Sequence, residues 1–165
     1  MGLRRCIGVV LCIAACAALS GRKAEGAETV NIITLPTAVS FAVTNVSIST
    51  TGAPNPSTIT YDTLKVLGRH ALRISLQATA AAFTPPAGIA TIPASNVSWT
   101  TSNAIHGTGF SGTLSSVAYV VVFQSDLAYV SGGVDLTWQL AAPGASIRAG
   151  NHTLVARWKL ESIVP

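Results

Sequence analysis

The sequence is poor in cysteine, in charged residues and in helical patterning. It has only three cysteines, Cys6, Cys12 and Cys16, and all of them precede residue 17. Charged residues make up 10% of the chain, and no segment carries an apolar stripe at helical spacing. Without disulfides a small exported domain needs a sizeable core, which roughly 140 residues can supply. These absences favour one β-rich domain held together by apolar packing.

The N-terminus has the layout of a secretory signal peptide. Arg4 and Arg5 form a basic start, residues 6–19 are uncharged and largely apolar, and small residues follow. The apolar stretch is shorter than the about 20 residues that a membrane-spanning helix requires. We therefore expect a cleavable signal peptide over residues 1–26, a single domain over residues 27–165, and no transmembrane anchor.

Two kinds of processing are compatible with this leader. Residues 18–20 and 24–26 both offer small residues at the positions that signal peptidase reads. Residues 13–16, Ile-Ala-Ala-Cys, resemble a bacterial lipoprotein box, in which Cys16 would be lipidated and become the new N-terminus. Both routes predict a secreted or cell-surface protein of a bacterial envelope, and the second route predicts a lipoprotein.

Most of the positive charge belongs to the leader. The whole chain has a formal net charge of +4, but residues 27–165 contain six basic and five acidic residues, a net charge of +1. A nearly neutral domain lacks the basic surface that nucleic-acid-binding proteins use to contact phosphates. We therefore expect no nucleic-acid partner.

Beyond residue 29 the apolar residues recur with a period of two. In residues 134–140 the positions Val134, Leu136, Trp138 and Leu140 alternate with polar or charged residues, and residues 154–161 repeat the pattern. Such alternation predicts β-strands with one buried face. Both tryptophans, Trp138 and Trp158, fall in phase with leucines, which places them in the core.

Shorter segments extend this pattern into a complete β-domain. Further strands are predicted over residues 29–35, over residues 39–48 with a slip or bulge near Thr44 and Asn45, and around residues 72–76, 97–99 and 117–123. Residues 29–35 would form an edge strand that ends at Pro36, whereas residues 117–123 read as a strand buried on both faces. Clusters of glycine and proline between these segments predict turns. The expected fold is an immunoglobulin-like antiparallel β-sandwich of about seven to nine strands.

No group of residues forms a convincing catalytic or metal-binding motif. His70, His106 and His152 are far apart in sequence and have no cysteine or histidine at ligand spacing, so we expect them to be solvated. No Gly-x-Ser-x-Gly motif is present, and the few carboxylates show no pairing typical of a glycosidase. The sequence therefore predicts a protein that is not an enzyme and has no cofactor or metal.

Aromatic side chains are the remaining candidates for ligand binding. Trp99 and Tyr129 lie near predicted loops, where exposed rings could stack on the faces of sugars. We expect these two residues to be the more exposed aromatics, and they are the predicted ligand-binding residues.

The last two predicted strands carry a motif of a known family. Trp138-Gln139-Leu140 and Trp158-Lys159-Leu160 are both Trp-x-Leu, and a proline follows the second at Pro165. This arrangement resembles the end of WxL domains in bacterial surface proteins. The resemblance implies a β-rich, non-enzymatic module of the cell wall, in which these Trp and Leu residues are mainly structural. The two motifs lie closer together here than is usual in that family.

Three roles are compatible with these features. The leading hypothesis is a secreted or surface-displayed module with a structural, adhesive or wall-associated role, whose partner is a cell-wall polymer or another envelope protein. A second is a fimbrial or pilin-like subunit that assembles into a homo-oligomer by strand addition, with residues 29–35 as a candidate donor. A third is a carbohydrate-binding module.

Overall fold

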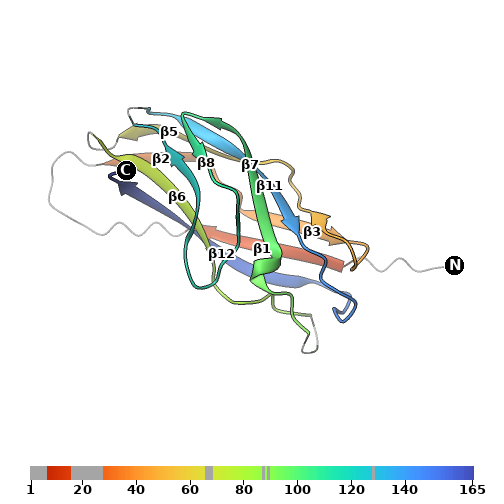
Figure 1. The fold of residues 1–165 in the computed structure, drawn as a ribbon. Coiled ribbons are helices and arrows are strands. Elements are labelled where there is room, and N and C mark those ends of the chain that lie inside the picture. Colours follow the sequence, from red (N-terminus) through yellow and green to blue (C-terminus); the bar gives the residue numbers. More distant parts are fainter. Residues whose placement is uncertain (1–6, 16–27, 66–68, 87, 89, 128) are drawn as a thin grey trace.

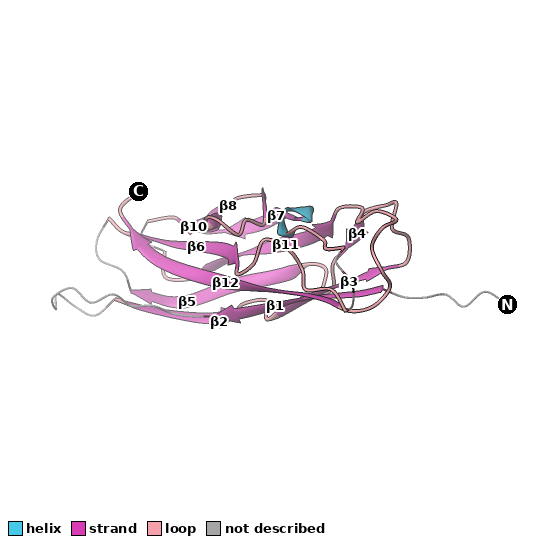
Figure 2. Cartoon of the chain, turned by 90° about the horizontal axis from the view of Figure 1, so that it is seen from below, coloured by secondary structure: helices cyan, strands magenta, loops and turns pink. Residues whose placement is uncertain are grey.

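The structure is a computed structural model that describes residues 7–15, 28–65, 69–86, 88, 90–127 and 129–165. In this part of the chain nearly all regular structure is β-strand, apart from one 3-10 turn at Ala94–Asn96. The strands form two sheets that pack face to face (Figures 1 and 2). The predicted all-β sandwich is therefore confirmed.

The first sheet, sheet A, contains the segment that the sequence assigns to the leader. Its order is β3 (Ala38–Val43), β1 (Ile7–Ala15), β12 (His152–Ile163), β6 (Ala71–Ala78), β10 (Val120–Ser125) and β8 (Gly107–Gly109). Strands β1 and β12 run parallel, and the other neighbouring pairs of this sheet are antiparallel. In Figure 1 β1 is the red strand beside the dark blue β12.

The second sheet, sheet B, is entirely antiparallel. Its order is β2 (Thr29–Thr34), β5 (Ser57–Lys65), β11 (Gly132–Leu140), β7 (Val97–Ile105) and β9 (Gly112–Thr113), and β4 (Thr50–Thr51) pairs with the end of β11. The described residues thus form twelve strands, more than expected, because β4, β8 and β9 have only two or three residues each. As predicted, β2 is an edge strand.

The core lies between the sheets and follows the period-two pattern of the sequence. On β11 the side chains of Val134, Leu136, Trp138 and Leu140 are buried, and on β12 those of Leu154, Ala156 and Trp158 are buried. Trp138 packs against Trp99 with ring centroids 5.6 Å apart. The indole nitrogens of Trp138 and Trp158 donate hydrogen bonds to the Ser57 hydroxyl and the Pro36 carbonyl. Both rings therefore bury their polar atom with a partner.

Two strand predictions were wrong in their boundaries. Residues 46–48 form a turn instead of a strand, and Ile48 is 56% exposed. The Asn45 side chain accepts a hydrogen bond from the Ser47 backbone N–H, a local contact that favours a turn over strand pairing. Residues 117–119 also lie outside any strand, and Val117 is 90% exposed.

The apolar run of β10 is explained by an irregular register instead of burial on both faces. The pairing of β10 with β6 shifts between Val121 and Phe123. This irregularity lets the consecutive residues Val122 and Phe123 both be buried, whereas Val121 is only half-buried. Because every residue from 117 to 123 is apolar, the sequence shows no alternation that could reveal the bulge.

Candidate functional site

The most unusual feature of the fold is the position of β1 inside sheet A. Strand β1 lies between β3 and β12 and pairs with both. The register runs from Val9 opposite His152 to Ala15 opposite Trp158, and from Ile7 opposite Val43 to Cys12 opposite Ala38. We call this position between β3 and β12 the slot. Its occupant falls within residues 1–26, the segment predicted to be cleaved.

The walls of the slot dictate which positions of an occupant face the core. Directly paired residues of neighbouring strands share one face of a sheet. Val9 pairs with Phe41 and His152, and Leu11 pairs with Val39 and Leu154. These four wall residues are at most 2% exposed. An occupant is therefore required to be apolar at the positions of Val9 and Leu11.

The intervening positions of the slot face solvent. Val10 pairs with Ser40 and Thr153, and Cys12 pairs with Ala38 and Val155. All four of these partners are exposed. The positions of Val9 and Leu11 therefore require apolar side chains, whereas those of Val10 and Cys12 accept polar or charged ones. Substitutions at the two sets of positions can show whether a segment binds in the register of β1.

Strand β3 depends on the slot for its place in sheet A. Among the described residues its only strand partner is β1, apart from an isolated bridge between Ser40 and Ala53. The adjacent edge of β12 is likewise paired with β1, while its other edge pairs with β6. The occupant of the slot is therefore what connects β3 to the rest of the sheet.

His152 lies at the start of β12, beside the slot, and is fully buried. The expectation that this histidine is solvated is therefore wrong. Its Nε2 lies 3.0 Å from the Arg148 carbonyl, which requires Nε2 to carry the proton. Nδ1 has no hydrogen-bond partner within the part of the chain that the structure describes.

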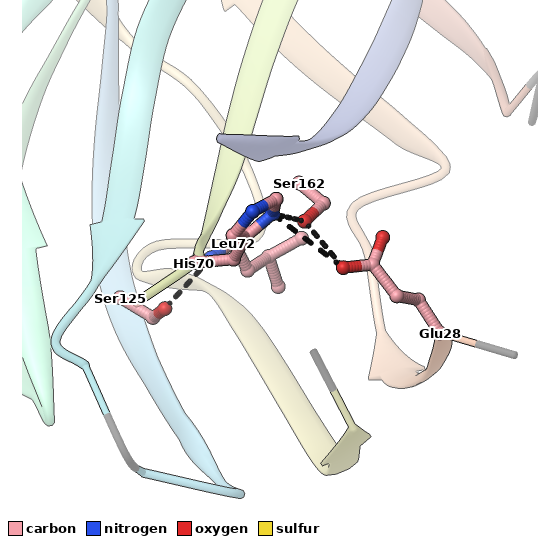
Figure 3. Close-up of polar contacts among 5 residues, drawn as sticks. All are labelled: Glu28, His70, Leu72, Ser125 and Ser162. Carbon is pink, nitrogen blue, oxygen red and sulfur yellow. Dashed lines mark hydrogen bonds and ion pairs between the residues drawn. The ribbon is translucent and has the colours of Figure 1, made fainter. Parts of the chain in front are cut away.

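A second polar cluster holds the start of β2 against the end of β12 (Figure 3). The Ser162 hydroxyl donates a hydrogen bond of 3.0 Å to the Glu28 carboxylate, and Nδ1 of His70 lies 2.8 Å from the same hydroxyl. His70 and Glu28 also form an ion pair at 3.5 Å when the imidazole is protonated. We call Glu28, His70 and Ser162 the Glu28 cluster. It ties Glu28, which directly precedes β2, to Ser162 near the end of β12.

The Glu28 cluster does not have the geometry of a hydrolytic triad. A triad places the imidazole between the serine and the carboxylate and uses its two nitrogens separately. Here Nδ1 of His70 faces both partners, and the Ser162 hydroxyl donates directly to Glu28. The arrangement therefore anchors two chain segments and does not activate a nucleophile.

The remaining histidine and the predicted binding residues lie apart from these features. His106 is exposed and stacks on Tyr129, with ring centroids 4.0 Å apart. Tyr129 is 47% exposed, as expected. The predicted exposure of Trp99 is wrong, because the ring is 1% exposed and its Nε1 donates to the Phe110 carbonyl. Within the described ranges no three metal-ligating side chains gather.

The two Trp-x-Leu motifs lie on β11 and β12, in different sheets. Trp138, Leu140 and Trp158 are buried in the core, and Leu160 is half-buried. The sequence alone shows the two Trp-x-Leu motifs, but no motif or periodicity in it indicates the slot or the Glu28 cluster.

Asp135 lies in a shallow depression on the outer face of sheet B. The Asn103 amide and the Thr58 hydroxyl both donate hydrogen bonds of 2.8 Å to its carboxylate. These bonds stabilise the ionised form, so they lower the pKa of Asp135 below its ordinary value, with the Asn103 bond contributing most.

Replacing Asn103 with glycine is expected to raise the pKa of Asp135 toward the ordinary carboxyl value. Glycine is chosen because Asn103 has a φ of 49°, which glycine tolerates. Since folding lowers this pKa, the ionised carboxylate stabilises the fold above its unfolded pKa, and that contribution disappears as the pH falls through the lowered value. NMR titration of the Asp135 carboxyl measures the shift. Thr58→Ala should raise the pKa less, and an unchanged titration in Asn103→Gly would contradict the assignment.

Comparison with known proteins leaves the family open. No protein-family model matches the sequence, and no curated protein is similar enough to be recognised as a relative. No helix among the described residues is long and apolar enough to cross a membrane.

Proposed function

We propose that this chain is a non-catalytic structural subunit of a bacterial envelope assembly, joined to another chain by strand addition. The observation that carries the proposal is the position of β1, a segment with the sequence of a signal peptide, inside sheet A. Its removal during export leaves the facing edges of β3 and β12 without a strand. Unpaired edges of this kind are ready templates for a strand from another chain.

An empty slot is costly for the domain. It takes away the strand that pairs with Val39, Phe41 and Leu154, whose side chains are at most 2% exposed when β1 is in place. Full burial of one such side chain is worth about 1.5–3 kcal/mol. Because these side chains also pack against the rest of the core, an empty slot forfeits part of this amount for each of them. The processed protein is thus expected to gain stability from whatever fills the slot.

The wider role follows from this mode of assembly. The resemblance to WxL domains supports a place in the cell wall or a surface complex, and burial of Trp138 and Trp158 agrees with a structural role for the motif. Burial of Trp99 removes the ring best suited to a sugar platform, so a carbohydrate-binding module is the less favoured role. Exported location, with cleavage before Ala27 or lipidation at Cys16, remains part of the proposal.

The direct test adds a slot-filling peptide to the processed protein. The protein is purified after export, and its N-terminus is determined by mass spectrometry. The peptide has the sequence of residues 7–15, with Cys12 replaced by serine and lysines added at both ends for solubility. At about 100 times its Kd the peptide should stabilise the fold by about 2.7 kcal/mol, a rise in Tm of about 5–10 °C.

Two matched peptides establish whether binding uses the observed register. Leu11→Asp places a charge opposite the buried Val39 and Leu154, so this peptide should not bind. Val10→Asp places the same charge opposite the exposed Ser40 and Thr153, so most binding should remain. A processed protein whose melting is indifferent to all three peptides would refute strand addition at the slot.

A further inference from the structure

We infer that the processed chain accepts a strand from a different protein and donates none to a second copy of itself. This inference rests on the proposed strand addition and specifies the partner. The partner is an extended, uncharged segment with β-branched or leucine side chains at every second position. It fills the places that Ile7, Val9, Leu11 and Ile13 take in the register of β1.

The chemistry of the partner follows from the wall residues of the slot. Ile7 pairs with the buried Val43, and Ile13 pairs with the buried Ala156. Together with the positions of Val9 and Leu11, this gives four consecutive inward positions lined by apolar side chains, with the buried His152 at one of them. Burying a charge there without a partner is costly, whereas apolar side chains are favoured. Residues 7–15 follow this pattern themselves, and their register defines the positions that the side chains of a partner strand would take.

The chain between the leader and the domain offers no such segment. Residues 17–28 contain Arg22, Lys23, Glu25 and Glu28, and their only large apolar residue is Leu19. Cleavage before Ala27 leaves just two residues ahead of β2. For either predicted cleavage site, the part that precedes the domain therefore lacks alternating apolar residues and cannot fill the slot of a second copy.

The first strand of the domain is already committed within its own chain. Strand β2 pairs with β5, and Val30 and Leu35 pack partly buried against the core. The Glu28 cluster fixes the residue that precedes β2 to Ser162 at the end of β12 (Figure 3). Donation of residues 29–35 to a neighbour would break the β5 pairing and this anchor together. The predicted donor segment is therefore part of the receiving domain.

The sequence of residues 29–35 also fits the slot poorly. Val30 and Ile32 alternate, but the next position in that phase is Thr34, and the opposite phase contains Asn31. Neither phase supplies the four successive apolar residues that the walls of the slot favour. A homopolymer built head to tail would thus replace a good intramolecular pairing by a poorer intermolecular one.

The test compares two peptides on the processed protein and measures its self-association. The first peptide carries residues 7–15 as designed above, and the second carries residues 28–35 with the same lysine ends. We expect the first to bind and the second to bind at least tenfold more weakly, as followed by fluorescence anisotropy. Sedimentation velocity should show that the protein alone forms no concentration-dependent chains, with or without added salt.

The outcomes separate the two proposals. If neither peptide binds, strand addition at the slot fails. If the first peptide binds but the protein forms chains that this peptide dissolves, strand addition stands and the inference of a different partner is overturned. Ser162→Ala serves as a further check, because it removes the Ser162 hydrogen bond to Glu28, keeps the contact between His70 and Glu28, and leaves the slot intact. Neither the wild type nor Ser162→Ala should form chains, and chains of either protein that the first peptide dissolves would overturn the inference.

Discussion

Replacing Trp158 with alanine is expected to lower the free energy of unfolding by about 3–5 kcal/mol. The ring is 1% exposed, and its Nε1 donates a hydrogen bond of 3.3 Å to the Pro36 carbonyl. The substitution therefore leaves a large cavity and an unpaired carbonyl at the junction between β2 and β3. Because a typical domain is stable by only about 5–15 kcal/mol, the substitution should remove between about a fifth and all of the stability of the fold.

Urea denaturation followed by circular dichroism measures this loss. Val155→Ala on the same strand is the matched control, because Val155 is 40% exposed on the opposite face of β12 and should change stability by at most about 0.5 kcal/mol. A loss below about 1 kcal/mol for Trp158→Ala, or an equal loss for both variants, would contradict the orientation of β12.

Replacing Gly133 with valine is expected to destabilise the fold by about 3 kcal/mol, the upper end of the usual cost of overpacking. A Cβ at this position would lie 2.3 Å from the Ile59 carbonyl oxygen and 3.3 Å from Cα of Thr60. Both of these atoms belong to the backbone of β5, so no side chain can turn aside to make room. The branched side chain would force β5 and β11 apart where their backbones pair.

Thermal unfolding compares this variant with Gly133→Ala and with Thr137→Val. The alanine variant should lose less stability than the valine variant, since it adds the Cβ alone. Thr137→Val changes a half-buried residue of the same strand and removes one exposed hydrogen bond to the Asn55 side chain, so it should cost at most about 1 kcal/mol. Wild-type stability in Gly133→Val would mean that β5 and β11 are not paired in the observed register.

Local patterns were sufficient to predict the inward-facing residues of two strands of this protein. Alternation identified the inward residues of β11 and β12, including Trp138 and Trp158, because the side chains of a strand point to opposite faces whatever the strand pairs with. Alternation failed where the pattern was interrupted. The run ending at Phe123 contained a register shift, and residues 46–48 were held in a turn by the Asn45 side chain.

Burial of single aromatics depended on contacts that are distant in sequence. Trp99 was expected near a loop and exposed, yet it packs against Trp138 and donates to the Phe110 carbonyl. His152 was expected in solvent, yet it is buried beside the slot. Neither outcome follows from the neighbouring residues, because each depends on which strand is placed opposite.

The sequence by itself determined an all-β domain, the inward-facing residues of β11 and β12, and an apolar N-terminal segment with the features of a leader. Only the tertiary structure decided that residues 7–15 lie between β3 and β12, and that Glu28 is anchored to Ser162. The physical reason is that strand pairing uses backbone N–H and C=O groups, which nearly all residues share. A period of two therefore shows which face is buried but does not identify the neighbouring strand.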